Sequence, residues 1–325
     1  MTPSQTDAAR LALLINRVQQ TVDWRDRSAF ADSLVALTRA LVPSEGESAP
    51  EVRERAEHLR RDGMFHLGPL LTAEQVAEIH AYLKTRPCYT GHVPPQGDGV
   101  PRTPEECAKL TNCGSYQRED ILRTPHLLEL ANRPELLALA EAYIGCTPTI
   151  YSINCFWSFP ERDTKYAQTQ LYHRDFDDFR FCTIFLFLTD IRMNDGAHYF
   201  LRGTHRREFV EQVYNERVAD KSLFPVDRLF TVTSYQERDV PSLFRTEYQP
   251  VIGPAGHGVI EDTYGLHKGD IPKTPRLLGW VRYGLYNNVT AYNDHPHGPA
   301  PREVSAGRIP DTPRHRFINR LLVEF

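Results

Sequence analysis

The sequence predicts an α+β protein in which helices pack on an antiparallel β-barrel or sandwich. Apolar residues recur at helical spacing through the first third of the 325-residue chain. From Thr149 onward, at least six short runs of aromatic and β-branched residues are bounded by turn residues. A run of helices followed by a run of strands is typical of an α+β layout rather than of a parallel α/β fold.

The N-terminal part of the chain is expected to contain four helices and one strand. The apolar spacing predicts two helices within residues 7–41, and residues 62–67 are expected to form a short strand. Thr72 and Gln75 fit a capping box that opens the third helix. The fourth helix, residues 134–144, begins with Pro and is followed by Gly, which are common helix boundaries.

The remaining segments are predicted as strands, loops and an extended tail. Residues 181–189 are expected to be a barrel strand buried on both faces, because the run is continuously apolar. Residues 87–125 are rich in Pro, Gly and Thr and are expected to form a long irregular lid, and residues 293–316 an extended surface tail. The expected strands are 149–157, 169–175, 181–189, 198–201, 258–264 and 277–286.

Composition excludes several classes of protein. The net charge is −4 and no basic run is long enough to follow a phosphate backbone, so no nucleic-acid partner is expected. No signal peptide and no window of about 18 apolar residues is present, so no membrane span is expected. Six cysteines without a C-x-x-C pair suggest reduced thiols, and a cytoplasmic location is therefore expected.

His173-Arg174-Asp175 is the one H-x-D or H-x-E motif in the sequence. Composition alone predicts about two such matches by chance, so the motif gains weight from its position at the end of an expected strand. Residues i and i+2 of a strand point to the same face. His173 and Asp175 would therefore form two corners of a 2-His-1-carboxylate site for non-haem Fe(II).

A third metal ligand and a carboxylate anchor are sought further along the chain. His267 follows an expected strand and is the best candidate for the third ligand, with His257 as its rival. Arg276 begins an alternating strand and is well shaped to bind a small dicarboxylate through a bidentate fork. Arg282, on the same strand face, is the alternative anchor.

Several stretches together resemble the phytanoyl-CoA dioxygenase-like family of Fe(II)/2-oxoglutarate-dependent oxygenases. The resemblance covers about Asp62 to Tyr286 and is carried by residues 62–71 with the helix after them, 134–145, the H-x-D motif, 196–205, and His267 with Arg276. It implies a double-stranded β-helix, a jelly-roll or cupin-like barrel, buttressed by N-terminal helices. A single catalytic domain, 1–325, is then expected.

The boundaries of this expected domain follow from the same resemblance. Residues 1–148 would be a mostly helical region with the lid segment, and 149–290 the jelly-roll core. Residues 206–250 would be an insertion in that core, and 291–325 an extended tail. Loops over a rigid scaffold carry most substrate contacts, so the lid and the insertion are the expected walls of the substrate site.

The resemblance also implies a reaction. His173, Asp175 and His267 would hold Fe(II), with 2-oxoglutarate and O2 as cosubstrates and succinate and CO2 as products. Arg276 would pair with the far carboxylate of 2-oxoglutarate, and Asn154 and Thr183 are candidates for its minor contacts. Hydroxylation of a small-molecule metabolite is expected. The alternatives are desaturation, oxidative cyclisation or a non-catalytic binding module, and the sequence does not indicate the oligomeric state.

Overall fold

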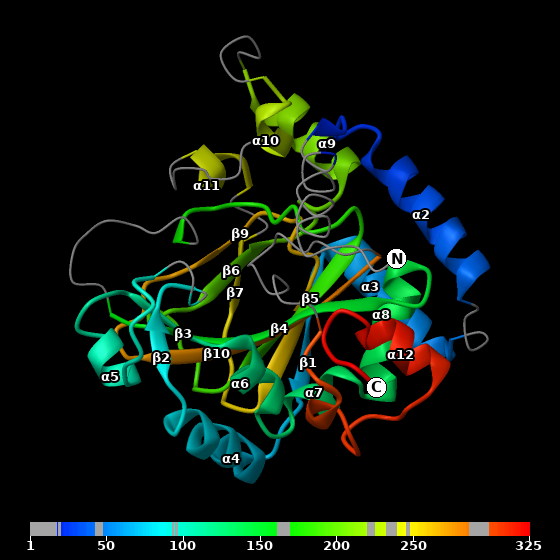
Figure 1. Cartoon of the computed structure of the whole chain (residues 1–325). Coiled ribbons are helices and arrows are strands. Elements are labelled where there is room, and N and C mark those ends of the chain that lie inside the picture. The colour runs from blue at the N-terminus through cyan, green and yellow to red at the C-terminus, as the bar shows by residue number, and fades with distance from the viewer. Residues whose placement is uncertain are drawn as a thin grey trace.

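Two antiparallel β-sheets form the centre of the molecule and helices surround them (Figure 1). The computed structural model describes residues 18, 21–42, 48–92, 94, 97–160, 170–219, 225–231, 239–244, 248–285 and 299–325. Seven strands form the large sheet, in the order β1 (Met64–Pro69), β8 (His257–Glu261), β5 (Phe181–Phe187), β10 (Arg276–Gly284), β4 (Thr149–Ser158), β3 (Cys113–Tyr116) and β2 (Cys88–Thr90). Three strands form the small sheet, in the order β7 (Tyr248–Val251), β6 (His198–Leu201) and β9 (His267–Gly269).

From β4 onward the chain alternates between the two sheets. After β4, an isolated bridge between His173 and His267 places His173 beside β9, at the edge of the small sheet. The chain then returns to the large sheet as β5, forms β6 and β7 in the small sheet, and continues as β8, β9 and β10 in alternate sheets. This exchange between two facing antiparallel sheets is the jelly-roll, or double-stranded β-helix, arrangement that the sequence resemblance implied.

The large sheet is buried on both faces. Alternate residues of β5 and β10 face the small sheet, and there Phe185, Phe187, Leu278 and Trp280 share a hydrophobic cluster with β6 and β7. The intervening residues belong to a larger cluster on the opposite face, which includes Leu186 and the buried faces of several helices. The expectation that strand 181–189 is buried on both faces is therefore confirmed, with every residue of β5 buried.

Helices cover the outer face of the large sheet. Helix α3 packs against α8, and α6, α7 and α12 all contact β4 (Figure 1). Among the described residues, no helix is long and apolar enough to cross a membrane. The helices from α2 to α8 are α2 (Arg27–Leu41), α3 (Pro50–Asp62), α4 (Ala73–Lys84), α5 (Pro104–Cys107), α6 (Arg118–Arg123), α7 (Leu127–Ala131) and α8 (Pro134–Ile144).

The helix boundary signals in the sequence are confirmed. Thr72 caps α4, since its side chain accepts a hydrogen bond from the Gln75 amide while the Gln75 side chain accepts one from the Thr72 amide. Helix α8 begins at Pro134 and ends before Gly145, whose φ of 100° lies in the left-handed region that glycine tolerates. Of the two helices expected within residues 7–41, α2 is described, and residues 1–17 lie outside the described part of the chain.

Two expectations about irregular segments are wrong. Residues 87–125 contain β2, α5, β3 and α6, because β4 provides the hydrogen-bonding edge on which the short strand β3 pairs and β2 follows. The tail is not extended over its described part, 299–325, which forms a short 3-10 helix (Arg302–Val304) and α12 (Pro313–Asn319). Ile318 and Leu322 of this tail are buried in the large core.

The segment expected to be an insertion also contains regular structure. It forms α9 (Arg207–Arg217), α10 (Arg228–Thr231) and α11 (Asp239–Phe244) before the chain enters β7. Buried residues of α9, such as Val210 and Tyr214, share a small cluster with Trp24 from the N-terminal region. Residues 220–224, 232–238 and 245–247 lie outside the described part of the chain, and so does residue 169. The strand expected over 169–175 is wrong for its described part, which forms no regular strand and pairs through an isolated bridge from His173 to His267.

Substitution of Leu186 tests whether packing on the outer face of the large sheet stabilises the fold. Leu186 is 1% exposed within the larger cluster, whereas Leu110 is 62% exposed. We expect Leu186→Ala to lower the free energy of unfolding by about 2–5 kcal/mol, because it removes buried methyl groups and leaves a cavity. The matched change Leu110→Ala should alter it by less than about 0.5 kcal/mol. Equal midpoints of urea denaturation for the two variants would contradict this assignment of the core.

Candidate metal centre

The backbone brings His173 and His267 face to face. The His173 amide donates to the His267 carbonyl at 2.9 Å, and the His267 amide donates to the His173 carbonyl at 3.1 Å. Two residues that exchange both hydrogen bonds in an antiparallel pair carry their side chains on the same face of the sheet. The imidazole ring centres are accordingly 4.2 Å apart.

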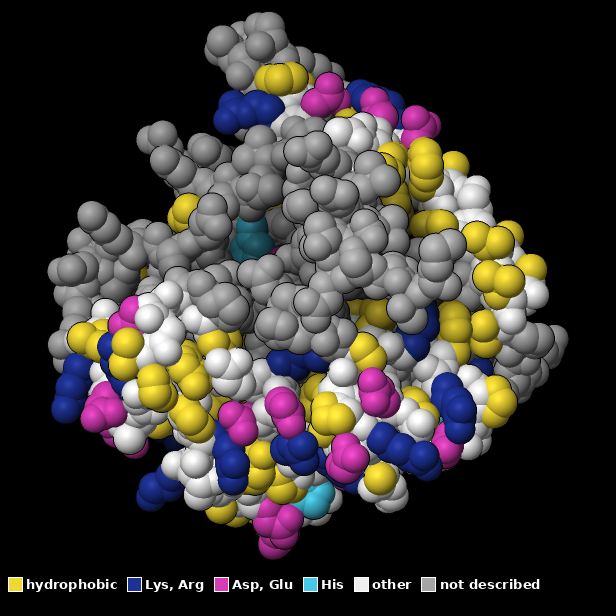
Figure 2. All heavy atoms as spheres, in the orientation of Figure 1, with side chains coloured by type: hydrophobic (Ala, Val, Ile, Leu, Met, Phe, Trp, Pro, Cys, Tyr) yellow, Lys and Arg dark blue, Asp and Glu magenta, His cyan; other side chains and the backbone are white. Residues whose placement is uncertain are grey.

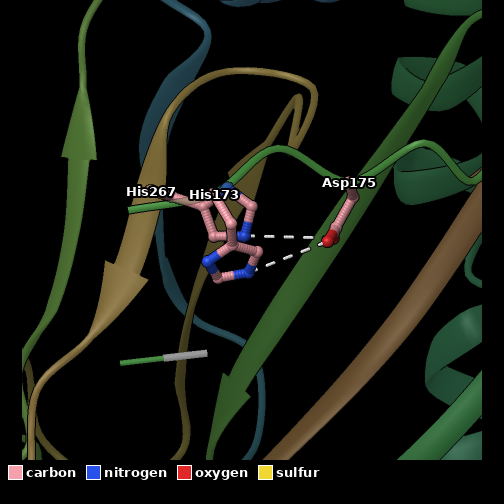
Figure 3. Close-up of side chains that lie close together, drawn as sticks. All are labelled: His173, Asp175 and His267. Atoms are coloured by element: carbon pink, nitrogen blue, oxygen red, sulfur yellow. Dashed lines mark ion pairs between the residues drawn. The ribbon is translucent and has the colours of Figure 1, made fainter. Parts of the chain in front are cut away.

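Asp175 completes a cluster of three possible metal ligands (Figure 3). Its amide donates to the Thr263 carbonyl at 2.8 Å, which fixes the backbone two residues after His173. The Asp175 carboxylate oxygens lie 3.8 Å from Nε2 of His173 and 3.9 Å from Nε2 of His267. One ligand atom from each of the three residues falls within 4.8 Å of the other two. The structure thus brings together the three residues that the sequence analysis selected as metal ligands.

Both histidines are oriented by backbone carbonyls. Nδ1 of His173 lies 2.8 Å from the Leu171 carbonyl oxygen, and Nδ1 of His267 lies 2.9 Å from the Gly265 carbonyl oxygen. A carbonyl oxygen accepts hydrogen bonds, so each Nδ1 carries the proton and donates. The lone pair of each neutral ring is then on Nε2, the atom that faces Asp175. Such a bond from the second ring nitrogen is the usual support of a metal-binding histidine.

Charge around the cluster keeps its members in the forms that bind metal. Burial lowers the pKa of His173, and burial together with the neighbouring His173 lowers that of His267 well below its ordinary value. Burial alone would raise the pKa of Asp175, but Arg282 and the two histidines lower it. Neutral imidazoles and an ionised carboxylate are the protonation states that metal binding requires.

Arg282 connects the metal ligands to a second buried carboxylate. Its Nη1 lies 3.3 Å from Asp175 and also donates to Asp177. The Tyr151 hydroxyl donates to Asp177 at 3.0 Å. Burial raises the pKa of Asp177 to about 6, and the nearby Asp175 adds to that effect. Arg282 is therefore engaged by two carboxylates, which is the arrangement that a buried guanidinium needs.

Arg174, between the two ligands of the H-x-D motif, points away from the cluster. It is 2% exposed, and its guanidinium donates to the carbonyls of Leu229, Thr204 and Tyr264. Successive side chains alternate between faces in an extended segment. The motif therefore places His173 and Asp175 on the metal side, while Arg174 joins α10 to the turn before α9.

Arg276 lies at the beginning of β10 with a different set of partners. It is 7% exposed, donates to the Gly196 carbonyl, and donates to the Ser158 hydroxyl at 3.1 Å. Its Nε is buried without a hydrogen-bond partner, and no carboxylate of the described residues lies within 4.0 Å of its guanidinium. Burial lowers its pKa to about 10. Arg276 is thus a buried cation that lacks a carboxylate counterion in the described part of the chain.

Asn154 and Thr183 lie on the face of the large sheet that carries Arg282 and Trp280. Asn154 is opposite Trp280 in the register of β4 and β10, and its side chain accepts from the Cys155 amide at 2.8 Å. Thr183 is opposite Arg282, and its hydroxyl lies 3.4 Å from that of Thr263. These contacts do not bear on 2-oxoglutarate binding, so the role expected for Asn154 and Thr183 stays a prediction.

Polar groups that the sequence analysis did not assign also line this region. The ring of His198 is centred 5.4 Å from that of His267, and its Nε2 lies 2.9 Å from the Glu261 carboxylate. Nδ1 of His92 lies 3.2 Å from the sulfur of Cys113, near the rim of the large sheet. Neither His92 nor Glu261 stands in a motif, so residue spacing offered no signal for them. His257, the rival third ligand, is not part of the three-residue cluster.

Side chains of the expected lid make contacts within the protein. On the described part of the face seen in Figure 2, charged side chains of both signs are mixed with hydrophobic ones. In the expected lid, Arg102 pairs with Asp98 at 2.7 Å, and the buried Tyr116 hydroxyl accepts from Trp157 at 2.8 Å. Arg102 and Tyr116 of the expected lid thus form an ion pair and a hydrogen bond with other residues of the chain.

Comparison with known proteins finds similarity among solved structures. No family model matches the chain, and neither does any curated protein sequence. The epimerase SnoN in complex with Fe3+, alpha ketoglutarate and nogalamycin RO is 19% identical, with a TM-score of 0.46 over 73% of this chain and 84% of that chain. EctD from S. alaskensis is 15% identical, with a TM-score of 0.48 over 74% and 80%. HygX from Streptomyces hygroscopicus, with nickel and 2-oxoglutarate bound, is 14% identical, with a TM-score of 0.45 over 71% and 86%.

Removal of any one of the three cluster residues is expected to abolish tight binding of a divalent metal. His173→Ala, Asp175→Ala and His267→Ala should each weaken Fe(II) or Co(II) binding more than about 100-fold, since loss of a mere supporting partner costs 10–100-fold. Anaerobic titration calorimetry measures this. His126→Ala is the matched control, because His126 pairs with Glu78 outside the cluster. Unchanged affinity in the three variants would refute the metal centre.

Proposed function

We propose that the chain is an Fe(II)/2-oxoglutarate-dependent dioxygenase that hydroxylates a C–H bond of a small-molecule substrate. The observation that carries the proposal is the buried cluster of His173, Asp175 and His267, with both Nε2 atoms and the carboxylate facing one another. A site with two histidines and one carboxylate leaves open coordination positions on non-haem Fe(II).

The residues present fit iron. Imidazole nitrogens suit zinc, copper, iron and nickel, and three ligands on one side leave room for further groups, whereas a structural zinc site is closed by four. Carbonyl oxygens fix both imidazoles, and Arg282 with Thr263 steadies Asp175. His173, Asp175 and His267 would hold the ion. Bound Fe(II), with 2-oxoglutarate and O2, supplies the oxidising chemistry, with succinate and CO2 as coproducts.

Arg276 is the residue proposed to bind the far carboxylate of 2-oxoglutarate. A buried guanidinium without a counterion is costly, and a carboxylate ligand would satisfy it. Ser158, its cross-strand neighbour, already receives a hydrogen bond from it and helps to hold the side chain in place. Arg282 is less suited to this role, because Asp175 and Asp177 engage it.

The interior walls would orient the substrate and exclude water. Phe156 and Trp280 lie between Arg276 and Arg282 on the inner face of the large sheet, with ring centres 5.0 Å apart. The Trp280 indole donates to the Ser152 hydroxyl at 3.0 Å, which fixes the ring. An apolar wall beside a reactive centre keeps competing water away and holds the carbon to be oxidised in place.

The substrate is proposed to be a small molecule rather than a nucleic acid or a membrane lipid surface. The chain is weakly acidic, and its metal cluster is buried behind the surface. A non-catalytic binding module would have no need of the three metal ligands or of Arg276, whose guanidinium has no carboxylate partner among the described residues. Desaturation or oxidative cyclisation would use the same residues, but each would give a product two hydrogens lighter than the substrate rather than one oxygen atom heavier.

Turnover is the direct test of the proposed function. Purified protein with Fe(II), ascorbate and 2-oxoglutarate should release succinate when a suitable small molecule from a metabolite mixture is added. Mass spectrometry should find a product that has gained one oxygen atom, and a loss of two hydrogens would instead indicate desaturation or oxidative cyclisation. The product should vanish in His173→Ala and persist in His126→Ala. Absence of succinate with every metabolite pool, together with absence of iron binding, would refute the proposal.

Arg276 provides a separate test of cosubstrate binding. Arg276→Gln should raise the Kd of the metal-loaded protein for 2-oxoglutarate about 30-fold or more, since loss of one partner of a buried charge pair costs about 2–5 kcal/mol. Arg276→Lys keeps the charge, so its Kd for 2-oxoglutarate should lie between those of the unaltered protein and Arg276→Gln. Arg192→Ala is the control, because this exposed arginine pairs with Asp190. Unchanged affinity in Arg276→Gln, with weaker binding in Arg282→Lys, would instead identify Arg282 as the anchor.

A further inference from the structure

A second cavity lies apart from the metal centre. It is formed by α2, the end of α8, the beginning of β5 and the turn that leads into α9, with a volume of about 240 Å³. None of the three cluster residues lines it, and neither does Arg276. The charged residues of its wall are five arginines and two acids: Arg27, Arg60, Arg180, Arg206, Arg207, Glu208 and Asp262.

Three of these arginines have carboxylate partners that lie outside the cavity wall. Arg60 pairs with Glu57, Arg180 with Asp32 at 2.7 Å, and Arg207 with Glu211 at 3.2 Å. Ion pairs of this kind are partly exposed and hold their arginines only loosely. The remaining two arginines differ, because neither has a carboxylate within 4.0 Å among the described residues.

Arg27 is the more constrained of the two unpaired arginines. It is 8% exposed, and its guanidinium donates a hydrogen bond to the Asp178 carbonyl. The guanidinium carbon lies 4.3 Å from the centre of the Tyr264 ring, a cation–π contact that offsets part of the cost of burial. Burial still lowers the pKa of Arg27. A buried cation at the wall of a cavity, with no carboxylate within 4.0 Å among the described residues, indicates a place for an anion.

Arg206 supplies a further donor at the turn before α9. Nε of Arg206 and Nδ1 of His205 are both buried without a hydrogen-bond partner in the described part of the chain. Nε2 of His205 contacts the Arg60 carbonyl oxygen at 2.8 Å. The Arg60 carbonyl accepts from Nε2 of His205, so Nδ1 of that ring is an acceptor and does not bind an anion. Buried polar atoms are nearly always hydrogen-bonded, so the unpartnered Nε of Arg206 calls for an acceptor from a ligand or ordered water.

Among the described residues, neither acid of the wall lies within 4.0 Å of the Arg27 or Arg206 guanidinium, although the charge of Asp262 acts to raise the pKa of Arg27. The carboxylate of Asp262 accepts hydrogen bonds from the Tyr143 hydroxyl and from the Tyr264 amide, the latter at 3.0 Å. Glu208 is exposed to solvent. Aromatic side chains complete the wall, among them Trp24, which stacks on Phe230 with ring centres 3.9 Å apart.

We propose that this cavity binds a small organic anion that bears a phosphate or carboxylate group next to an apolar or aromatic part. Arg27 and Arg206 bind the anionic group, because guanidinium groups match the geometry of phosphate and carboxylate oxygens. The aromatic walls contact the rest of the ligand. The volume is below the ordinary range of about 300–1,000 Å³ for ligand pockets, which limits the ligand to a compact molecule.

Calorimetry with three probes tests this proposal and distinguishes the two anionic groups. Phenyl phosphate, benzoate and inorganic phosphate are titrated into the full chain. We expect phenyl phosphate or benzoate to bind, and the tighter of the two identifies the anionic group. Arg206→Ala and Arg27→Lys should each raise the Kd of that probe about tenfold or more, because a hydrogen bond to a charged group is lost or misplaced.

Two control variants separate this cavity from the rest of the molecule. Arg192→Ala, an exposed arginine remote from the cavity wall, should bind the probe as the unaltered chain does. His173→Ala should also retain binding, since loss of binding there would place the probe at the metal centre. Binding that is absent for all probes, or unchanged in both Arg206→Ala and Arg27→Lys, would overturn the proposal. If inorganic phosphate bound as tightly as phenyl phosphate or benzoate, the proposal that the ligand has an apolar or aromatic part would be wrong.

Discussion

The pair of backbone hydrogen bonds between His173 and His267 is the constraint on which the metal centre depends. It joins a short segment after β4 to β9, and so places two imidazoles from distant parts of the chain on one face of the small sheet. Asp175 then follows by strand alternation, two residues after His173. A single cross-strand pair thus fixes the backbone positions of the two histidines, and the hydrogen bond from the Asp175 amide to the Thr263 carbonyl fixes that of the third candidate ligand.

The two buried arginines of β10 differ in whether carboxylates neutralise their charge. Arg282 and Arg276 lie on the same face of one strand, six residues apart, which corresponds to about 20 Å along a strand. Arg282 is compensated by Asp175 and Asp177, so it belongs to the structural support of the metal ligands. Arg276 has only neutral partners among the described residues, so its charge remains available to a ligand.

The sequence predicted the parts of this molecule that depend on local chemistry. The capping box at Thr72 and the proline and glycine around α8 are local signals, and the alternation in the H-x-D motif correctly sets Arg174 apart from its neighbours. Strands β2 and β3 were missed because their pairing depends on β4 rather than on their own composition. Asp177 was missed for the same reason, since its partner Arg282 comes from another strand.

Residues 262–264 connect the metal centre to the second cavity. The Thr263 carbonyl accepts from the Asp175 amide, and the Thr263 hydroxyl helps to lower the pKa of Asp175. Asp262 and Tyr264, on either side of it, line the cavity. Residues 262–265 form a turn in which the Gly265 amide donates to the Asp262 carbonyl at 2.9 Å. Thr263 does not line the cavity, so the two sites share this backbone but no side chain. Each can therefore bind its own ligand, while the position of the segment affects both.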